Sequence, residues 1–337
     1  MTKRVVSLGE IMMRLSPPGY ERFVQADTLD MHFGGGEANV VLALSNYGMK
    51  GVFVSKVPDT AIGQAAINHL RRYGVDTQFI MRGGARLGIY FKENGTSVRA
   101  PQVIYDRAGS SISEAEIIDF DFDKIFEGAD WFHISGITPS LSEKAAALAE
   151  ATLKVAKAKG IRISIDINFR KKLWSIERAR EVMTKLCHHA DVCIGPDACL
   201  GFTDEDADLL ECDFDLERYK VVFEKMKKEF GFKYIASTLR DSHSASDNSL
   251  RALVYDGQEF YLTKKYDVRI VDRVGSGDSF ASGFIYGLLT GMPMAESAEF
   301  GIAAAALKHT IPGDVNHASL DEVKALMNGD GRGLLKR

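Results

Sequence analysis

The stretch DRVGSGDSF, residues 272–280, places two glycines around a serine, with one aspartate directly after them and another six residues before that one. The segment before it, KYDVRIVD (265–272), is strand-like, and the segment after it, ASGFIYGLLTG (281–291), has the apolar spacing of a helix. We therefore predict a junction in which a strand leads through a glycine loop into a helix.

This junction predicts an anion-binding site with a carboxylate beside it. The backbone N–H groups of Gly275, Ser276 and Gly277 can turn inward, and the positive end of the helix dipole adds to them. Asp278 follows in the first turn, where a negative charge beside a bound anion costs free energy unless it has a chemical task. Phosphoryl transfer supplies that task, because the attacking hydroxyl needs a base while backbone donors stabilise the transferring group. The alternative is that Asp278 only caps the helix, as aspartate often does.

Outward from the junction, short apolar runs alternate with helix-period segments along the chain. Such runs indicate strands buried on both faces, and their alternation with helices predicts a mostly parallel sheet in an α/β protein. The expected strands are RVVSLGE (4–10), GVFVSKV (51–57), WFHISG (131–136), IRISIDIN (161–168), DVCIGP (191–196) and KYIAST (233–238). The expected helices include EANVVLALSNYG (37–48), AIGQAAINHLRRYG (61–74) and SEKAAALAEATLKVAKAKG (142–160).

Two segments interrupt this alternation. Residues 11–33 contain a Pro17-Pro18 pair and little helical period, and residues 86–107 resemble a hairpin with Asn94-Gly95 as a turn signal. We interpret them as a small β sheet that covers a site like a lid; the alternative is surface decoration.

Composition narrows the class of protein. The formal net charge of the 337-residue chain is -4 and no basic block occurs, so a nucleic-acid partner is not expected. No apolar stretch approaches membrane-spanning length, and the first residues do not resemble a secretory leader. The four cysteines fit neither a zinc pattern nor a disulfide framework, so we expect reduced thiols in a cytoplasmic protein: Cys187, Cys193, Cys199 and Cys212.

DRVGSGDSF closely resembles the C-terminal signature of the PfkB, or ribokinase-like, carbohydrate kinases, and FGGGEANVVLAL (33–44) resembles their N-terminal glycine signature. P-loop and protein-kinase motifs are absent from the sequence. The resemblance covers nearly the whole chain and implies a single domain over residues 1–337, a three-layer α/β sandwich with a β lid. It also implies an ATP-dependent kinase with Asp278 as general base, and a homo-oligomer paired through the lid. Mg²⁺ is expected as cofactor because phosphoryl transfer from ATP normally needs it.

Two arginines near the expected site indicate an acidic substrate, because a sugar acid needs cationic partners. Arg107 directly follows the hairpin and Arg170 follows an expected strand, and the guanidinium group of arginine can bind a carboxylate through two parallel hydrogen bonds. The segments LGIYF, IYDRAGSS and DINFRKKLW together resemble the 2-keto-3-deoxygluconate kinase branch of the family, whose product is 2-keto-3-deoxy-6-phosphogluconate. By that resemblance the sugar acid contacts Gly34, Gly35, Gly36, Glu37, Ala38, Asn39, Tyr90, Tyr105, Arg107, Arg170 and Asp278.

The sequence leaves alternative roles for the arginines and alternative functions open. Each arginine alone could equally form a surface or interstrand ion pair. A fructokinase-like or other neutral-sugar kinase of the same family is the nearest alternative, and a non-catalytic sugar sensor on the kinase fold is another. The sequence does not distinguish gluconate-derived from galactonate-derived keto acids, which differ at a single centre.

Positions at strand ends, the glycine loop and the resemblance together suggest where ATP and cations bind. ATP is expected near Asp166, Asn168, Thr238, Arg240, Gly275, Gly277 and Asn316. Many relatives carry an Asn-x-x-Glu motif linked to metal recruitment, but this chain has GPDACLGF, with Asp197 and no glutamate three residues on, so its metal ligands stay unassigned. Members of the family often bind a monovalent cation near the loop that begins at Asp272, and such a cation is a further expectation.

Overall fold

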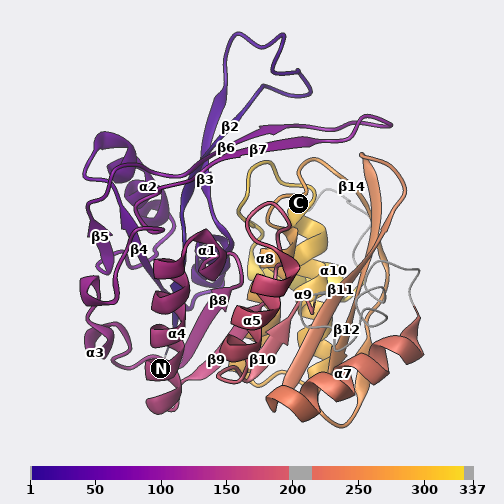
Figure 1. Cartoon of the computed structure of the whole chain (residues 1–337). Helices are drawn as coiled ribbons and strands as arrows, with labels where there is room; N and C mark the ends of the chain where they lie inside the picture. The colour runs from indigo at the N-terminus through magenta and orange to yellow at the C-terminus, as the bar shows by residue number, and fades with distance from the viewer. Residues whose placement is uncertain (1, 197–214, 330–337) are drawn as a thin grey trace.

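A ten-stranded sheet lies at the centre of the computed structural model, which describes residues 2–196 and 215–329 (Figure 1). One run of neighbouring strands is parallel, in the order β11 (Tyr234–Ser242), β10 (Val192–Ile194), β9 (Arg162–Asp166), β8 (Trp131–Ser135), β1 (Arg4–Leu8), β4 (Lys50–Val57) and β5 (Ile80–Arg82). Antiparallel strands extend the β11 edge: β12 (Asp247–Tyr255), β13 (Phe260–Leu262) and β14 (Tyr266–Arg269). The mostly parallel sheet predicted from the sequence is confirmed, and the six expected strand segments are all strands.

Helices cover both faces of the sheet. Successive residues of a strand point to opposite faces, so neighbouring residues pack against different helices. Val5 and Val6 are neighbours in β1, are fully buried, and belong to separate hydrophobic clusters. The cluster with Val5 packs α1 (Gly36–Asn46), α2 (Ala61–Arg72), α8 (Ser276–Thr290), α9 (Met294–Lys308) and α10 (Leu320–Met327). The cluster with Val6 packs α3 (Phe122–Ile125), α4 (Glu143–Ala158), α5 (Ile176–Cys187) and α7 (Leu216–Phe230). The three-layer α/β arrangement is thereby confirmed.

A separate four-stranded sheet forms the lid and contains both segments that interrupt the α/β alternation. Its strand order is β3 (Asp30–Gly34), β2 (Met12–Ser16), β6 (Ile89–Glu93) and β7 (Gln102–Asp106). In Figure 1 the strands β2, β6 and β7 project above the rest of the molecule. Because β2 follows β1 after only a few residues, the lid starts at the edge where the parallel strands end.

The hairpin between β6 and β7 is present, but its turn is not at the predicted position. The two strands pair as far as Glu93 and Gln102, so the connection is longer than a two-residue Asn-Gly turn. A tight turn closes further along, where Thr96 and Arg99 exchange backbone hydrogen bonds of 2.9 Å and Ser97 takes a positive φ of 52°. The Asn94 side chain instead donates to the carbonyl oxygen of Gly19 at 2.7 Å and thereby ties the hairpin to the other lid segment.

No helix among residues 2–196 and 215–329 has the length and apolar character needed to cross a membrane. Asp197, Cys199 and Cys212, on which the sequence-based expectations about metal binding and thiols partly rest, lie outside the described residues.

Candidate active site

A cavity of about 650 Å³ opens where the lid, the ends of the parallel strands and the first turns of α1 and α8 meet. Ligands of open α/β sheets bind beyond the carboxyl ends of the strands, and this cavity occupies that position. It brings together most residues predicted for the site, from segments far apart in the chain: Gly35, Gly36, Asn39, Tyr90, Tyr105, Arg107, Asp166, Asn168, Arg170, Thr238, Arg240, Gly275, Ser276, Gly277 and Asp278.

Four predicted residues do not line this cavity, which corrects their placement: Gly34, Glu37, Ala38 and Asn316. The Glu37 side chain is buried behind the residues that line the cavity. One of its carboxyl oxygens accepts hydrogen bonds from the Ser135 hydroxyl at 2.8 Å and the Thr138 hydroxyl at 2.7 Å. Asn316, predicted near the nucleoside, is buried; its amide donates to the Ala304 carbonyl at 3.0 Å. Glu37 and Asn316 therefore support the fold beneath the site.

The predicted anion cradle is the N-terminus of α8. Gly275 precedes the helix with a φ of 79°, and a Cβ atom there would lie 1.7 Å from the Asp314 carbonyl oxygen, so only glycine fits. By contrast, nothing lies within 4 Å of a Cβ atom built on Gly277, which lines the cavity. Because the first N–H groups of a helix have no partner within it, the first turn of α8 can donate to phosphoryl oxygens.

Asp278 is not the cap of α8. The N-cap position is Gly275, with no side-chain capping bond, and the Asp278 carboxylate instead accepts a hydrogen bond of 2.7 Å from Nδ2 of Asn39. Asn39 in turn accepts from the Gly35 N–H at 3.3 Å. A Cβ atom on Gly35 would lie 1.9 Å from the Glu10 carbonyl oxygen, so the start of α1 requires glycine for close approach. The two glycine segments thus meet at one carboxylate.

Its surroundings make Asp278 a suitable base at neutral pH. The side chain keeps some exposed surface toward the cavity, while protein surrounds the carboxyl group. Desolvation there raises the pKa of Asp278 to about 7; Glu37 and Asp314 add to this, and the Asn39 hydrogen bond and Arg170 oppose it. A base with a pKa near the working pH is well matched to taking a proton from an alcohol in the transition state.

The pH dependence of the reaction follows from this pKa. We expect kcat/KM to rise as pH increases through about 7, because only ionised Asp278 accepts the proton. Asn39→Ala should move this rise to higher pH, since the Asn39 hydrogen bond lowers the pKa of Asp278. Asn46→Ala is the matched control: Asn46 lies on the same helix and bonds the Asn316 carbonyl. A rise that stays in place in Asn39→Ala would contradict the assignment.

Positive charge gathers beside the cradle. Nη2 of Arg240 donates to the Ser276 hydroxyl at 3.1 Å, and both Arg240 and Arg273 line the cavity. Desolvation and the neighbouring charge of Arg273 lower the pKa of Arg240. Two adjacent cations at a helix N-terminus favour a bound polyphosphate, which would relieve their repulsion.

The two arginines expected to bind the sugar acid differ in their partners. Arg107 is buried and forms an ion pair with Glu10, with 2.8 Å between its Nε and Oε2 of the glutamate. Arg170 is exposed to the cavity, and its Nη1 donates to the Phe169 carbonyl at 3.4 Å. Within residues 2–196 and 215–329 no carboxylate forms an ion pair with Arg170.

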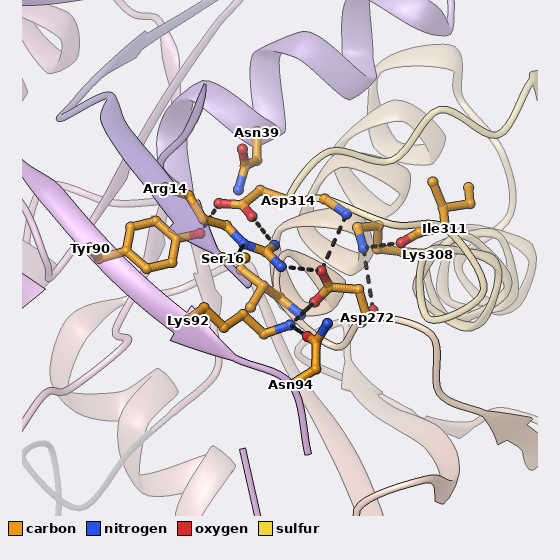
Figure 2. Close-up of polar contacts among 12 residues, drawn as sticks. Arg14, Ser16, Asn39, Tyr90, Lys92, Asn94, Asp272, Lys308, Ile311 and Asp314 are labelled. Atoms are coloured by element: carbon orange, nitrogen blue, oxygen red, sulfur yellow. Dashed lines mark hydrogen bonds and ion pairs between the residues drawn. The ribbon is translucent and has the colours of Figure 1, made fainter. Parts of the chain in front are cut away.

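Asp314 also lines the cavity, although it was not among the residues predicted for the site from the sequence. Its carboxylate binds Nη1 of Arg14 at 2.7 Å and accepts a short hydrogen bond from the Tyr90 hydroxyl (Figure 2). Tyr90 therefore offers its ring, more than its hydroxyl, to the cavity. Asp314 lies in the turn after α9, and the preceding Gly313 is the local sequence signal for that turn. No nearby residue indicated that Asp314 would bind side chains of the lid.

The first turn of α8, with free N–H groups and Asp278 beside it under the lid, has the arrangement that phosphoryl transfer to an alcohol needs. Residues 2–210 and 247–319 match the pfkB family carbohydrate kinases. The chain belongs to that family and is an ATP-binding carbohydrate kinase, so the non-catalytic sensor alternative is not supported.

Individual relatives agree with this membership. A 2-dehydro-3-deoxygluconokinase structure from Thermotoga maritima has 44% identity and a TM-score of 0.92, covering 97% of this chain and 100% of that chain. A 2-dehydro-3-deoxygalactonokinase from Haloferax volcanii is 32% identical over 334 residues, 99% of each chain. A candidate ribokinase II from E. coli, solved with ATP and Mg²⁺, shares the fold at 21% identity and a TM-score of 0.80, covering 97% of this chain and 99% of that chain.

Proposed function

We propose that the chain transfers the γ-phosphoryl group of ATP to the 6-hydroxyl of 2-keto-3-deoxygluconate, giving 2-keto-3-deoxy-6-phosphogluconate. The observation that carries the proposal is the charge of Arg170, which lines the same cavity as Asp278 and has no carboxylate partner among the described residues. An anionic substrate would supply that partner. The names of the Thermotoga and Haloferax relatives, both kinases of 2-keto-3-deoxy sugar acids, point the same way.

In the proposed reaction the chain positions an alcohol and moves one proton. Arg170 and Arg107 would hold the carboxylate end of the sugar acid, with Tyr90 and Tyr105 along its length. The 6-hydroxyl would then lie at Asp278, which accepts its proton as the oxygen attacks the γ-phosphorus and ADP leaves. The N–H groups at the start of α8 would hold the transferring oxygens.

Mg²⁺ would neutralise the phosphates of ATP during this transfer. Within the described ranges no group of three or more His, Cys, Asp and Glu side chains is arranged to hold a metal ion. Mg²⁺ usually keeps several waters and binds phosphate oxygens with one or two carboxylates. Asp166 lines the cavity at the end of β9 and is the carboxylate we assign to this role, next to Asn168 and Thr238 on the nucleotide side.

A neutral-sugar kinase is the second candidate. The ion pair with Glu10 favours it, because it already balances the charge of Arg107 and leaves that guanidinium able to donate to hydroxyls as well as to a carboxylate.

The position of the phosphate tests the proposal directly. The chain would be incubated with Mg²⁺-ATP and either 2-keto-3-deoxygluconate or 2-keto-3-deoxygalactonate, and the product examined by phosphorus NMR. We expect a phosphomonoester coupled to the two protons of a primary carbon, at least with the gluconate-derived acid. A secondary ester, or no ester with either acid, would overturn it.

We further propose that two copies pair through their lids. β7 is an edge strand with unpaired backbone groups, and two of its neighbouring apolar side chains are exposed, Ile104 by 53% and Tyr105 by 41%. Light scattering after gel filtration should give a dimer, and Ile104→Asp should give a monomer; a monomeric wild type would refute the pairing.

A further inference from the structure

The glycine loop begins at a buried carboxylate whose charge is already balanced. Asp272 is 3% exposed, and its side chain binds Nη2 of Arg14 at 2.7 Å and Nζ of Lys92 at 2.6 Å. The backbone N–H groups of Val274 and Gly313 donate to the same carboxylate at 3.1 and 3.2 Å. Figure 2 shows both lid cations converging on Asp272.

A third cationic side chain, that of Lys308, contacts the loop through main-chain carbonyl oxygens. Lys308 is the last residue of α9 and is 0% exposed. Its Nζ donates to the main-chain carbonyl of Ile311 at 2.9 Å and to that of Asp272 at 3.3 Å, as Figure 2 shows. Burial lowers the pKa of this amine to about 8 while Asp272 and Asp314 raise it, so the amine stays mostly protonated at pH 7.

The Lys308 ammonium group donates to two backbone carbonyl oxygens, the kind of oxygen that K⁺ and Na⁺ ions bind in proteins. The family resemblance led us to expect a monovalent cation near Asp272, and the residues present do not fit one. The Asp272 and Ile311 carbonyls already accept from Lys308. Three cationic side chains face two carboxylates in this network, so another cation would meet repulsion.

We propose that the Lys308 ammonium is a built-in replacement for the monovalent cation of this loop, and that the kinase works without free K⁺ or Na⁺. Lys308 touches no substrate and is a positioning residue. It ties the start of the glycine loop to the turn after α9, and that turn carries the Asp314 carbonyl against which Gly275 packs. The fixed charge thereby holds the first turn of α8, and Asp278 with it, in place.

The wild-type protein gives the first test. Kinase activity and melting temperature would be measured in KCl, NaCl and tetramethylammonium chloride at equal ionic strength, because the large organic cation cannot enter a carbonyl site. We expect the activities to agree within about twofold and the melting temperatures to agree between the salts. Activation by K⁺ of about fivefold or more over tetramethylammonium would overturn the proposal.

The second test removes the ammonium and leaves the carbonyls. Lys308→Ala should lose at least about tenfold in activity in tetramethylammonium chloride, because two buried carbonyls lose their donor. KCl should restore several-fold of this loss and raise the melting temperature by about 2 °C or more, since an ion that binds only the folded state stabilises it. Lys92→Ala is the matched control: it removes a buried cation from the same aspartate but leaves both carbonyls bound to Lys308, so K⁺ should not rescue it.

A Lys308→Ala variant that retains full activity in tetramethylammonium chloride would contradict the role, as would equal rescue of both variants by K⁺. If Lys308→Ala does not fold, the wild-type comparison still decides. The melting measurements need no substrate, so an incorrect assignment of the sugar would leave this result standing.

Discussion

Replacing Asp278 by asparagine is expected to lower kcat about a thousandfold while the fold and ATP affinity are preserved. The amide keeps the size of the side chain and can still contact Asn39, but it cannot take a proton from the attacking hydroxyl. General-base catalysis typically contributes about 10²- to 10⁴-fold, so the loss should fall in this range. Steady-state kinetics, with nucleotide binding by calorimetry, would measure both effects.

A carboxylate outside the cavity supplies the control. Asp119 binds Nζ of Lys56 at 2.7 Å and lies away from the cavity lining, so Asp119→Asn should keep kcat within about twofold. Near-normal turnover in Asp278→Asn would show that another group takes the proton. Asp278→Asn should also remove the rise in kcat/KM through pH 7, because it removes the group that titrates there.

Arg170→Ala is expected to cost about 1.5–3 kcal/mol in transition-state binding of the sugar acid, a fall in kcat/KM of about 10- to 150-fold. The reason is the loss of a charged hydrogen bond to the substrate carboxylate. The same change should alter the reaction with a neutral ketose far less, which separates a carboxylate contact from general damage to the site. Kinetics with the acid and with fructose would measure this difference.

Arg178→Ala is the matched control, because Arg178 is an arginine of α5 that pairs with Glu143 and Glu181 outside the cavity. We expect unchanged kinetics for it. If Arg170→Ala lowers kcat/KM equally for the acid and the neutral sugar, Arg170 does not bind the substrate carboxylate, and a contact with the phosphates of ATP would be assigned to it instead. Arg107→Ala is less informative, since it strands the buried carboxylate of Glu10.

The parts of the molecule that follow local rules could be predicted from the sequence. The buried strands are apolar runs, and α1 and α4 have helical spacing with a glycine soon after each helix ends, so the layers follow from composition and periodicity. The glycine loop before α8 was predictable because a glycine loop between a strand and a helix commonly forms an anion-binding site. Its geometry requires Gly275, which explains why this signal was strong.

Contacts across the chain could not be predicted in the same way. The pair between Arg14 and Asp314 joins residues 300 positions apart, and no local pattern indicates it. Lys308 resembles an ordinary basic residue in the last turn of a helix, and its function appears only when Asp272 is placed beside it. The resemblance placed Asn316 near the nucleotide, but the turn buries its side chain against the Ala304 carbonyl, a contact that no local pattern indicates.

Substrate preference is tested most directly by a coupled ADP-release assay with Mg²⁺-ATP, comparing 2-keto-3-deoxygluconate and 2-keto-3-deoxygalactonate with fructose and ribose. We expect turnover of at least the gluconate-derived acid with a kcat/KM about a hundredfold or more above that of either neutral sugar, because only the acid can pair with the charge of Arg170. Equal or faster turnover of fructose or ribose would contradict it.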